Sequence, residues 1–219
     1  MPHELDGPDG LDRAVRIAPS RLRPWIDGFE RRHGEVGSIL EGDRVRLVAP
    51  DGAEAELVVP FPPLHTHLPL LDALVAHVSA ERRLGALLVR KGGFAVGVFD
   101  GPRLVASKVG SAYVQGKTKA GGWSQQRYAR RRDNQSRKAY AEAAGAAVRV
   151  LLPHLERLEG LATGGDKPAV SAVLADPRLA ELGPLVLPQV HAVPDPRQRV
   201  LEAFPEQFLA VQIHLNALA

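Results

Sequence analysis

The chain contains no cysteine among its 219 residues, which excludes disulfide bonds and cysteine-ligated zinc. It also lacks long apolar runs, because stretches such as Gly85 to Val89 are far too short to cross a membrane. The N-terminal sequence, Met1 to Asp6, is acidic and lacks the basic-then-apolar pattern of a signal peptide. We therefore expect a cytoplasmic protein with no membrane partner.

Two ligand-binding patterns are missing as well. The phosphate-loop pattern G-x-x-x-x-G-K-[ST] is matched only at its last three positions, Gly116-Lys117-Thr118, since Gly110 lies one place too early. The sequence His65-Thr66-His67 has metal-like spacing, but it stands in a proline-rich connector without clustered acids. We therefore expect neither a metal nor a cofactor.

The composition is that of an ordinary globular protein, with 45% hydrophobic and 24% charged residues. Its length suits one large domain or one domain with an appendage. We place a boundary near residue 66. Residues 1–66 form an N-terminal extension, in which Arg21 to Arg32 reads as a helix and Asp43 to Ala49 with Ala53 to Val59 as a β-hairpin.

Residues 67–219 are expected to form the main domain. Apolar spacing predicts a helix from Leu68 to Leu84 and a long helix from Gln125 to Leu152, separated by an antiparallel meander and a glycine- and lysine-rich loop. The expected meander strands are Ala86 to Arg90, Phe94 to Phe99 and Leu104 to Val109. The last third alternates between strands and helices: Gly160 to Thr163, Lys167 to Leu174 with Asp166 as N-cap, Leu179 to Leu182, Gln189 to Val193 and Pro196 to Phe208. The fold class is therefore α/β (α+β), a mixed sheet with an antiparallel meander and packed helices.

Positive charge is concentrated in one segment. Between residues 117 and 138 the only acid is Asp133, and the segment carries +7 against +3 for the whole chain. This clustering is typical of a polyphosphate partner, although a solvated helix face gives the same pattern. The basic residues are Lys117, Lys119, Arg127, Arg130, Arg131, Arg132, Arg137 and Lys138.

The loop before the long helix has features of a reactive tip. Gly121 and Gly122 allow a close backbone approach to a ligand, and the start of the helix, with Ser124 as a candidate N-cap, presents unpaired N–H groups. Gln125 could hold a water molecule through one donated and one accepted hydrogen bond, and Trp123 could stack on an RNA base or fold back on the domain. Residue chemistry leaves catalysis, passive RNA binding and a structural loop open.

A resemblance adds to this pattern. The meander, the glutamine-bearing glycine loop and the arginine-rich helix are similar to the middle domain of eukaryotic and archaeal class-1 release factors, which carry Gly-Gly-Gln. The stretch from Gly122 to Gln125 fits the relaxed Gly-x-x-Gln motif of the Vms-like release factor (VLRF) family, and residues 120–135 resemble its actinobacterial-type members. The likeness runs from about residue 68 to 204. The zinc-finger, ankyrin and partner-binding appendages of eukaryotic members are not found here.

The resemblance implies a peptidyl-tRNA hydrolase that acts on stalled large ribosomal subunits in ribosome quality control, with Gln125 in the catalytic role beside Gly121 and Gly122. It also implies a supporting basic residue, for which Lys117 and Lys119 are the candidates. The expected partners are the large subunit, its rRNA and peptidyl-tRNA, and we expect the protein to act as a monomer.

Two other functions compete with this one. A non-catalytic RNA- or ribosome-binding module would use the same basic helix without turnover. A metal-dependent nuclease would need several converging carboxylates, and the available acids, Glu81, Asp100 and Asp166, show no clear convergence in the sequence. Serine nucleophiles have no histidine close in sequence; the candidates are Ser107, Ser111 and Ser124.

Overall fold

The computed structural model describes residues 11, 13–111 and 124–219, and in the last range it describes side chains from residue 136 onward. The chain forms two compact units: unit 1 comprises residues 1–80 and 208–219, and unit 2 comprises residues 81–207. This division differs from the expected boundary near residue 66. The helix that follows that point packs Ala73, Leu74 and Val78 into the core of unit 1, and the end of the chain returns to the same unit.

Unit 1 is built on a five-stranded antiparallel sheet. The order is β1-β10-β4-β3-β2, so the strand nearest the C-terminus lies between β1 and β4. The expected helix and hairpin are confirmed, whereas β1, β2 and β10 were not expected. The elements are β1 (Arg13–Ile17), α1 (Pro19–His33), β2 (Gly37–Glu41), β3 (Arg44–Val48), β4 (Glu54–Val58), α2 (Leu70–Ser79) and β10 (Val211–Leu215).

The core of unit 1 lies between α1 and one face of this sheet. Leu22, Ile26 and Phe29 recur at helical spacing along α1, and all three are fully buried. They share a hydrophobic cluster with Leu57 and Ile213, which lie opposite each other on β4 and β10. Burial of this one face fixes the register of the sheet, since a shift by one residue would turn the apolar set outward.

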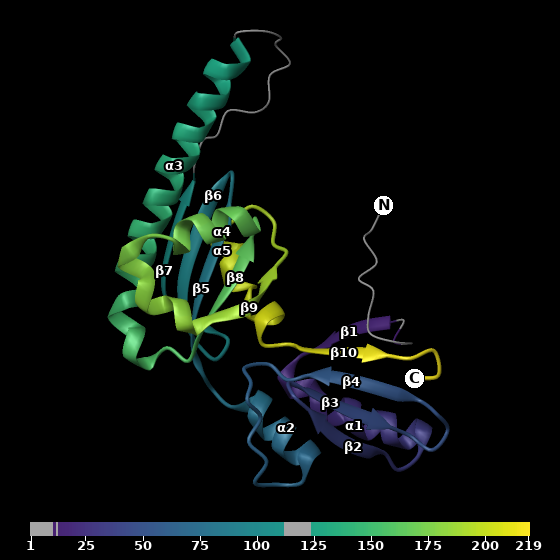
Figure 1. Cartoon of the computed structure of the whole chain (residues 1–219). Coiled ribbons are helices and arrows are strands. Elements are labelled where there is room, and N and C mark those ends of the chain that lie inside the picture. Colours follow the sequence, from purple (N-terminus) through teal and green to yellow (C-terminus); the bar gives the residue numbers. More distant parts are fainter. Residues whose placement is uncertain (1–10, 12, 112–123) are drawn as a thin grey trace. The chain divides into compact units, whose positions relative to one another are not determined.

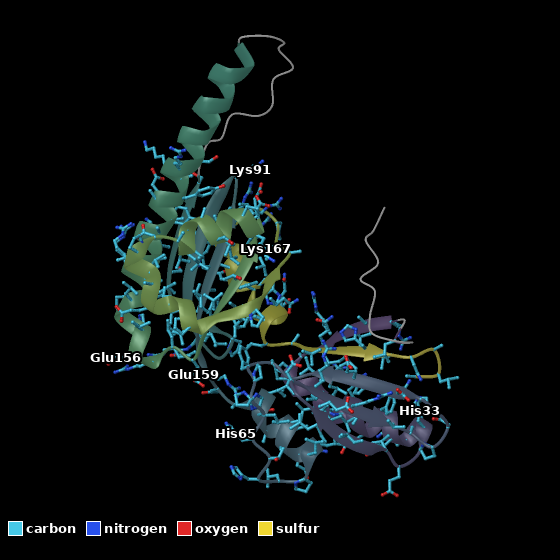
Figure 2. All side chains as sticks on the ribbon, in the orientation of Figure 1. His33, His65, Lys91, Glu156, Glu159 and Lys167 are labelled. Carbon is cyan, nitrogen blue, oxygen red and sulfur yellow. The ribbon has the colours of Figure 1, made fainter. Side chains whose placement is uncertain are left out.

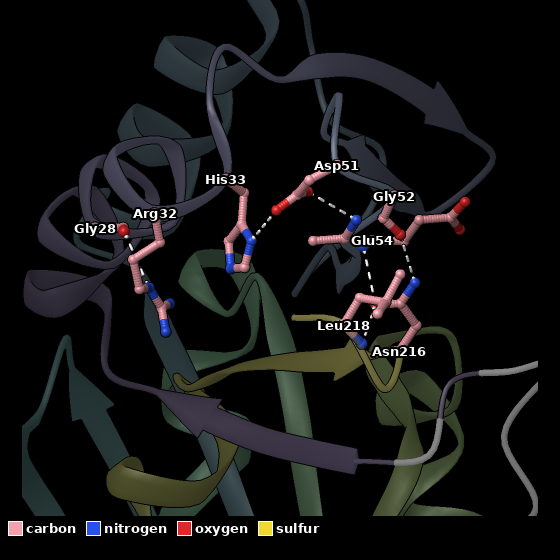
Figure 3. Close-up of polar contacts among 9 residues, drawn as sticks. Gly28, Arg32, His33, Asp51, Gly52, Glu54, Asn216 and Leu218 are labelled. Atoms are coloured by element: carbon pink, nitrogen blue, oxygen red, sulfur yellow. Dashed lines mark hydrogen bonds and ion pairs between the residues drawn. The ribbon is translucent and has the colours of Figure 1, made fainter.

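Asn216 fastens the end of β10 to the turn between β3 and β4 (Figure 3). Its Oδ1 accepts hydrogen bonds from the backbone N–H of Glu54, at 3.1 Å, and of Leu218, at 3.2 Å. Its Nδ2 donates to the carbonyl oxygen of Gly52 at 2.9 Å. In the same turn, Asp51 lies 2.8 Å from Nδ1 of His33 at the end of α1. The turn is therefore held from two sides.

Unit 2 contains a mixed five-stranded sheet of order β7-β6-β5-β8-β9. Strands β5, β6 and β7 form the expected antiparallel meander, and β8 and β9 continue the sheet in parallel, which confirms the predicted fold class. The strands are β5 (Arg83–Arg90), β6 (Gly93–Asp100), β7 (Arg103–Ser111), β8 (Gly160–Gly165) and β9 (Val186–His191). The helices are α3 (Ser124–Leu151), η1 (Leu152–Arg157), α4 (Lys167–Leu174), η2 (Pro177–Leu185) and α5 (Gln198–Glu202).

Helices cover both faces of this sheet. A Cβ atom added at Gly85 would lie 3.2 Å from Leu151 of α3, on the face that also carries Leu87. A Cβ atom added at Gly97 would lie 3.1 Å from Leu201 of α5, on the other face. Because both faces are covered, β5 and β6 are almost wholly buried and read as continuous apolar runs.

Helix α3 has two halves of different character. Its C-terminal half buries Ala143, Ala144, Ala147 and Leu151 against the sheet, which confirms the predicted apolar stripe. Its N-terminal half extends beyond the strands of unit 2 (Figure 1). The helix is 28 residues long but polar, and no helix in the described part of the chain is both long and apolar enough to cross a membrane.

Two expected helices were wrong in extent. The helix predicted from Leu68 to Leu84 ends at Ser79, because Leu84 enters β5, where it is fully buried opposite Phe99. The helix predicted from Pro196 to Phe208 is divided into α5 and α6 (Pro205–Phe208). Pro205 explains this division, since it lacks the N–H group that a continuous helix would need.

Candidate functional site

The candidate site lies at the end of unit 2 from which α3 projects (Figure 1). Helix α3 begins at Ser124, so Gln125 is its second residue. The first four N–H groups of an α-helix have no partner within the helix, and the helix dipole places partial positive charge at the same end. The backbone at Gln125 is therefore suited to meet an anion or a developing negative charge.

The residues predicted for the site fall into three groups. Gly121, Gly122, Trp123, Lys117 and Lys119 lie outside the described residues. The backbones of Gln125, Arg127, Arg130, Arg131 and Arg132 belong to α3, but their side chains lie outside the described part of the structure. Arg137 and Lys138 are described in full, and both are exposed.

The helix sets the distance between these residues and the core of unit 2. Its axis rises about 1.5 Å per residue, so the fifteen steps from Gln125 to Tyr140 span roughly 20 Å. Tyr140 is the first residue of the stripe that packs against the core of unit 2. Gln125 and the arginines therefore stand on a polar arm, and the sheet anchors that arm at Tyr140.

A second group of cations, which the sequence alone did not single out as a site, lies at the base of the arm. Strands β5 and β8 run parallel, with Val89 opposite Gly165, so the residues that follow each strand come together. Lys91 donates its backbone N–H to Asp166 at 3.3 Å. Figure 2 shows Lys91 and Lys167 at this same end of unit 2. Only the parallel pairing reveals this proximity.

Asp166 and Arg90 hold this junction in place. The sequence predicted Asp166 as the N-cap of α4, and it occupies that position, but its side chain makes no capping hydrogen bond. Its carboxylate instead accepts from Lys91 and lies 3.6 Å from the guanidinium of Arg90. Gly165 has φ 104°, and a Cβ atom added there would lie 2.1 Å from the carbonyl oxygen of Val89, so this close approach requires glycine.

The opposite end of the sheet is neutralised internally. Arg83 forms a bidentate pair with Asp100, at 2.5 and 2.8 Å, and Arg103 lies 3.5 Å from the same carboxylate. The hydrogen bonds from Arg83 lower the pKa of the Asp100 carboxyl and raise that of Arg83. Arg82 likewise lies 3.7 Å from Glu159.

This arrangement counts against the metal-dependent nuclease. Glu81 and Asp100 lie at the neutralised end, where Gly101 approaches Glu81, whereas Asp166 lies at the end from which α3 projects. One strand of eight residues separates them, which is about 25 Å. Among the described residues no three acids or histidines come close enough to hold a metal.

The remaining candidate residues are isolated. His65 and His67 are exposed, and His65 is labelled in Figure 2. The hydroxyl of Ser107 donates to Oε1 of Gln198 at 3.5 Å, so its recorded partner is an amide and not a base. Ser111 is exposed at the end of β7. Neither of these two serines pairs, in the described structure, with a histidine or carboxylate that would activate it as a nucleophile, and the side chain of Ser124 lies outside the described part of the structure.

Comparison with known proteins places the chain among translation release factors. Residues 82–214, more than half of the chain, match the family model described as "Actinobacteria/chloroflexi VLRF1 release factor". The chain belongs to this family. The matched segment begins one residue before the first strand of unit 2 and ends within β10.

Two archaeal relatives and one solved structure are similar to the chain. Peptide chain release factor subunit 1 of Pyrococcus abyssi (strain GE5 / Orsay) is 32% identical over 166 residues, which is 72% of this chain and 38% of the relative. Its counterpart in Thermococcus onnurineus (strain NA1) is 31% identical over 119 residues, 51% of this chain and 29% of the relative. The crystal structure of the archaeal translation termination factor aRF1 is 16% identical, with a TM-score of 0.42, over 90% of this chain and 66% of that one. The chain thus spans well under half the length of the two curated relatives.

Proposed function

We propose that this protein is a peptidyl-tRNA hydrolase that releases nascent chains on stalled large ribosomal subunits during ribosome quality control. Membership of the release-factor family is the observation that carries the proposal. Two features of the chain support it: the sequence from Gly122 to Gln125 fits the relaxed motif, and Gln125 stands in the first turn of a projecting basic helix. Its proposed partners are the large subunit, its rRNA and the tRNA that carries the peptide.

In the proposed mechanism, Gln125 positions the water that attacks the ester carbon. An amide can accept one hydrogen bond from water and donate another, but it does not titrate near neutrality, so it orients the nucleophile without acting as a strong base. Unpaired N–H groups at the start of α3 would stabilise the negative charge that develops on the carbonyl oxygen. The water oxygen bonds to the carbonyl carbon, the ester C–O bond breaks, and the proton leaves with the tRNA 3′ hydroxyl.

The test is hydrolysis of peptidyl-tRNA held in isolated large subunits by Gln125→Ala and wild type. One preorganised contact of this kind is worth about 3 kcal/mol, or roughly a hundredfold in rate, so turnover should fall by that factor. Binding to the subunits should remain, since the arginines of α3 are unchanged. Gln126→Ala, one position along the helix, is the matched control and should keep turnover. Turnover of Gln125→Ala within a few-fold of wild type would leave the non-catalytic ribosome-binding module as the better description.

A further inference from the structure

The end of unit 2 from which α3 projects carries exposed lysines that the proposed catalytic mechanism does not use. Lys91 follows β5 and Lys167 opens α4, and the parallel pairing of β5 with β8 brings these positions together although 75 residues separate them in the chain. Lys108, on β7, is exposed on the sheet face that α3 covers, since its partner Val96 belongs to the core under α3. We call Lys91 and Lys167 the sheet-end lysines.

The sheet-end lysines have no acidic partner among the described residues. The two acids nearby do not neutralise them: Asp166 pairs with Arg90 and accepts only the backbone N–H of Lys91. Asp195, whose carboxylate would lie 3.7 Å from a Cβ atom added at Gly92, offsets part of this charge but is not paired with either lysine. At the opposite end of the sheet, by contrast, Arg82, Arg83 and Arg103 are all paired with carboxylates. Unit 2 therefore keeps unpaired positive charge at one end.

This surface is polar as well as basic. Among the described residues of unit 2, the one large apolar side chain with high exposure is Val105, 37% exposed, on β7. Protein interfaces are built around buried apolar and aromatic anchors, and this end of the unit offers none in its described part. Exposed lysines suit phosphate, which they meet as point charges. Charge complementarity thus favours a nucleic-acid backbone over a protein.

We propose that the sheet-end lysines dock on backbone phosphates of ribosomal RNA, as a contact separate from the basic face of α3. The inference rests on the proposed function because it takes the large subunit as the partner. The sheet end stands roughly 20 Å behind Gln125, the length of the projecting arm. With Gln125 at the ester, the sheet-end lysines would lie about one arm length away, where backbone phosphates of the subunit's RNA are the partners that their charge favours.

The experiment measures binding to isolated large subunits stripped of tRNA, across a salt series. Lys91→Gln/Lys167→Gln removes two positive charges from the sheet end. Arg149→Gln/Arg157→Gln is the matched control, because it removes two exposed positive charges elsewhere on unit 2. A phosphate contact contributes about 0.7–0.9 to the slope of log affinity against log salt, so the lysine variant should lose about 1.5 from this slope. Between 50 and 200 mM salt, wild-type affinity should then fall roughly tenfold more than that of the variant.

A second variant guards against a folding effect. Lys91→Arg/Lys167→Arg keeps both charges and should bind like wild type. Loss of binding in this variant as well would show that charge is not the cause, and would overturn the proposal. Binding of Lys91→Gln/Lys167→Gln that matches the control variant would overturn it too.

Further arms identify the RNA and separate this inference from the proposed function. The lysine effect should be the same on empty subunits and on subunits that carry peptidyl-tRNA, and absent on a tRNA acceptor hairpin alone. An effect confined to tRNA-bearing samples would assign these lysines to tRNA and overturn the rRNA contact. Because empty subunits report binding without turnover, wild type that docks through these lysines yet fails to hydrolyse the ester would remove the proposed function and leave this inference standing.

Discussion

The two units share an architecture but differ sharply in charge. Each has a five-stranded sheet with helices packed on it, yet unit 1 holds 13 acidic and eight basic residues, a net charge of −5, whereas unit 2 holds 12 acidic and 20 basic residues, a net charge of +8. Seven of the eight net positive charges of unit 2 belong to residues 117–138. The comparison teaches that the layered fold gives no indication of where a polyanion binds, while the distribution of charge does.

The units also differ in what their cations contact. On the sheet of unit 1, Arg46 lies 2.6 Å from Glu54, and Arg44 pairs with Glu56 on the neighbouring strand. In unit 2, Lys91 and Lys167 have no such partner among the described residues. A paired surface arginine adds little to stability and is less available to a ligand. Unit 1 also carries exposed arginines without an ion pair to a described residue, such as Arg13 and Arg21, and so the number and position of the cations, more than their pairing, distinguish the two surfaces.

The largest expected effect separates the units by stability. Phe29→Ala in unit 1 and Phe99→Ala in unit 2 each remove a fully buried ring, which should lower the free energy of unfolding of the affected unit by about 3–5 kcal/mol. If unit 2 carries the chemistry, Phe99→Ala should lose peptidyl-tRNA hydrolysis as unit 2 unfolds, and Phe29→Ala should keep it. Denaturant unfolding and turnover of both variants check this. Equal loss of turnover in both variants would contradict the prediction that hydrolysis depends on unit 2 and not on unit 1.

The next effect tests whether position or charge alone matters. Replacing Arg130, Arg131 and Arg132 together by Glu should weaken binding to the large subunit at least tenfold and flatten its salt dependence, because phosphate contacts release counterions. The fold should survive, since these residues precede Tyr140, the first described residue of α3 that packs against the core.

The matched control makes the same three charge reversals in unit 1, at exposed arginines without an ion pair to any described residue. Subunit co-sedimentation across a salt series and thermal unfolding should show this control binding within a few-fold of wild type. If both triple variants weaken binding to the large subunit equally, the net charge of the protein, and not the position of the arginines on α3, determines binding. The control positions are Arg13, Arg21 and Arg31.

A smaller effect concerns acid stability. Hydrogen bonds from Arg178 lower the pKa of Asp176, in unit 2, to about 2, and the hydrogen bond with His33 lowers the pKa of Asp51, in unit 1. A lowered folded-state pKa adds stability that is complete above the unfolded pKa, near 4, and is lost as the pH falls toward 2. Asp176→Asn should therefore unfold at a temperature that changes less between pH 5 and pH 2 than that of wild type. If the unfolding temperatures of the two proteins change identically with pH, Asp176 does not contribute to acid stability.

For removal of metal ions by a chelator, we expect no effect on the rate of hydrolysis. Hydrolysis should continue after treatment with a chelator, once magnesium is supplied to keep the ribosome intact, because the described residues of both units offer no metal ligand set. Activity restored only by zinc or manganese would favour the nuclease chemistry and would give unit 2 a site that its described residues do not contain.

Much of this fold could be predicted from local pattern. The meander of unit 2 is signalled by apolar runs around tight turns, and the packed half of α3 by alanines at spacings of three and four. Strands β1 and β10 were missed because β1 pairs with β10, and β10 with β4, across long stretches of chain, where no local period marks the partner. Pairing of this kind depends on the tertiary core, with Ile213 buried between its neighbours.

The candidate site, like the fold, could be predicted from the sequence only where its residues are contiguous. The charge run and the motif at Gln125 can be read directly from the sequence, because their residues are contiguous. Lys91 and Lys167 could not be brought together that way: each looks like a turn or helix-start lysine until β5 and β8 are known to run side by side. The close approach of Gly165 to Val89 belongs to the same junction, and only its glycine gives a local sign of it.

The position of β10 in unit 1 has a consequence for synthesis. A ribosome makes a chain from the N-terminus, and domains usually fold in that order as they emerge. Among the described strands β1 pairs with β10 alone, so the sheet of unit 1 stays unfinished until Val211–Leu215 has been made. Every strand of unit 2 is complete before then. Unit 1, whose residues are made first, therefore completes its sheet last. The strands of unit 2 have all been made while the sheet of unit 1 still lacks β10.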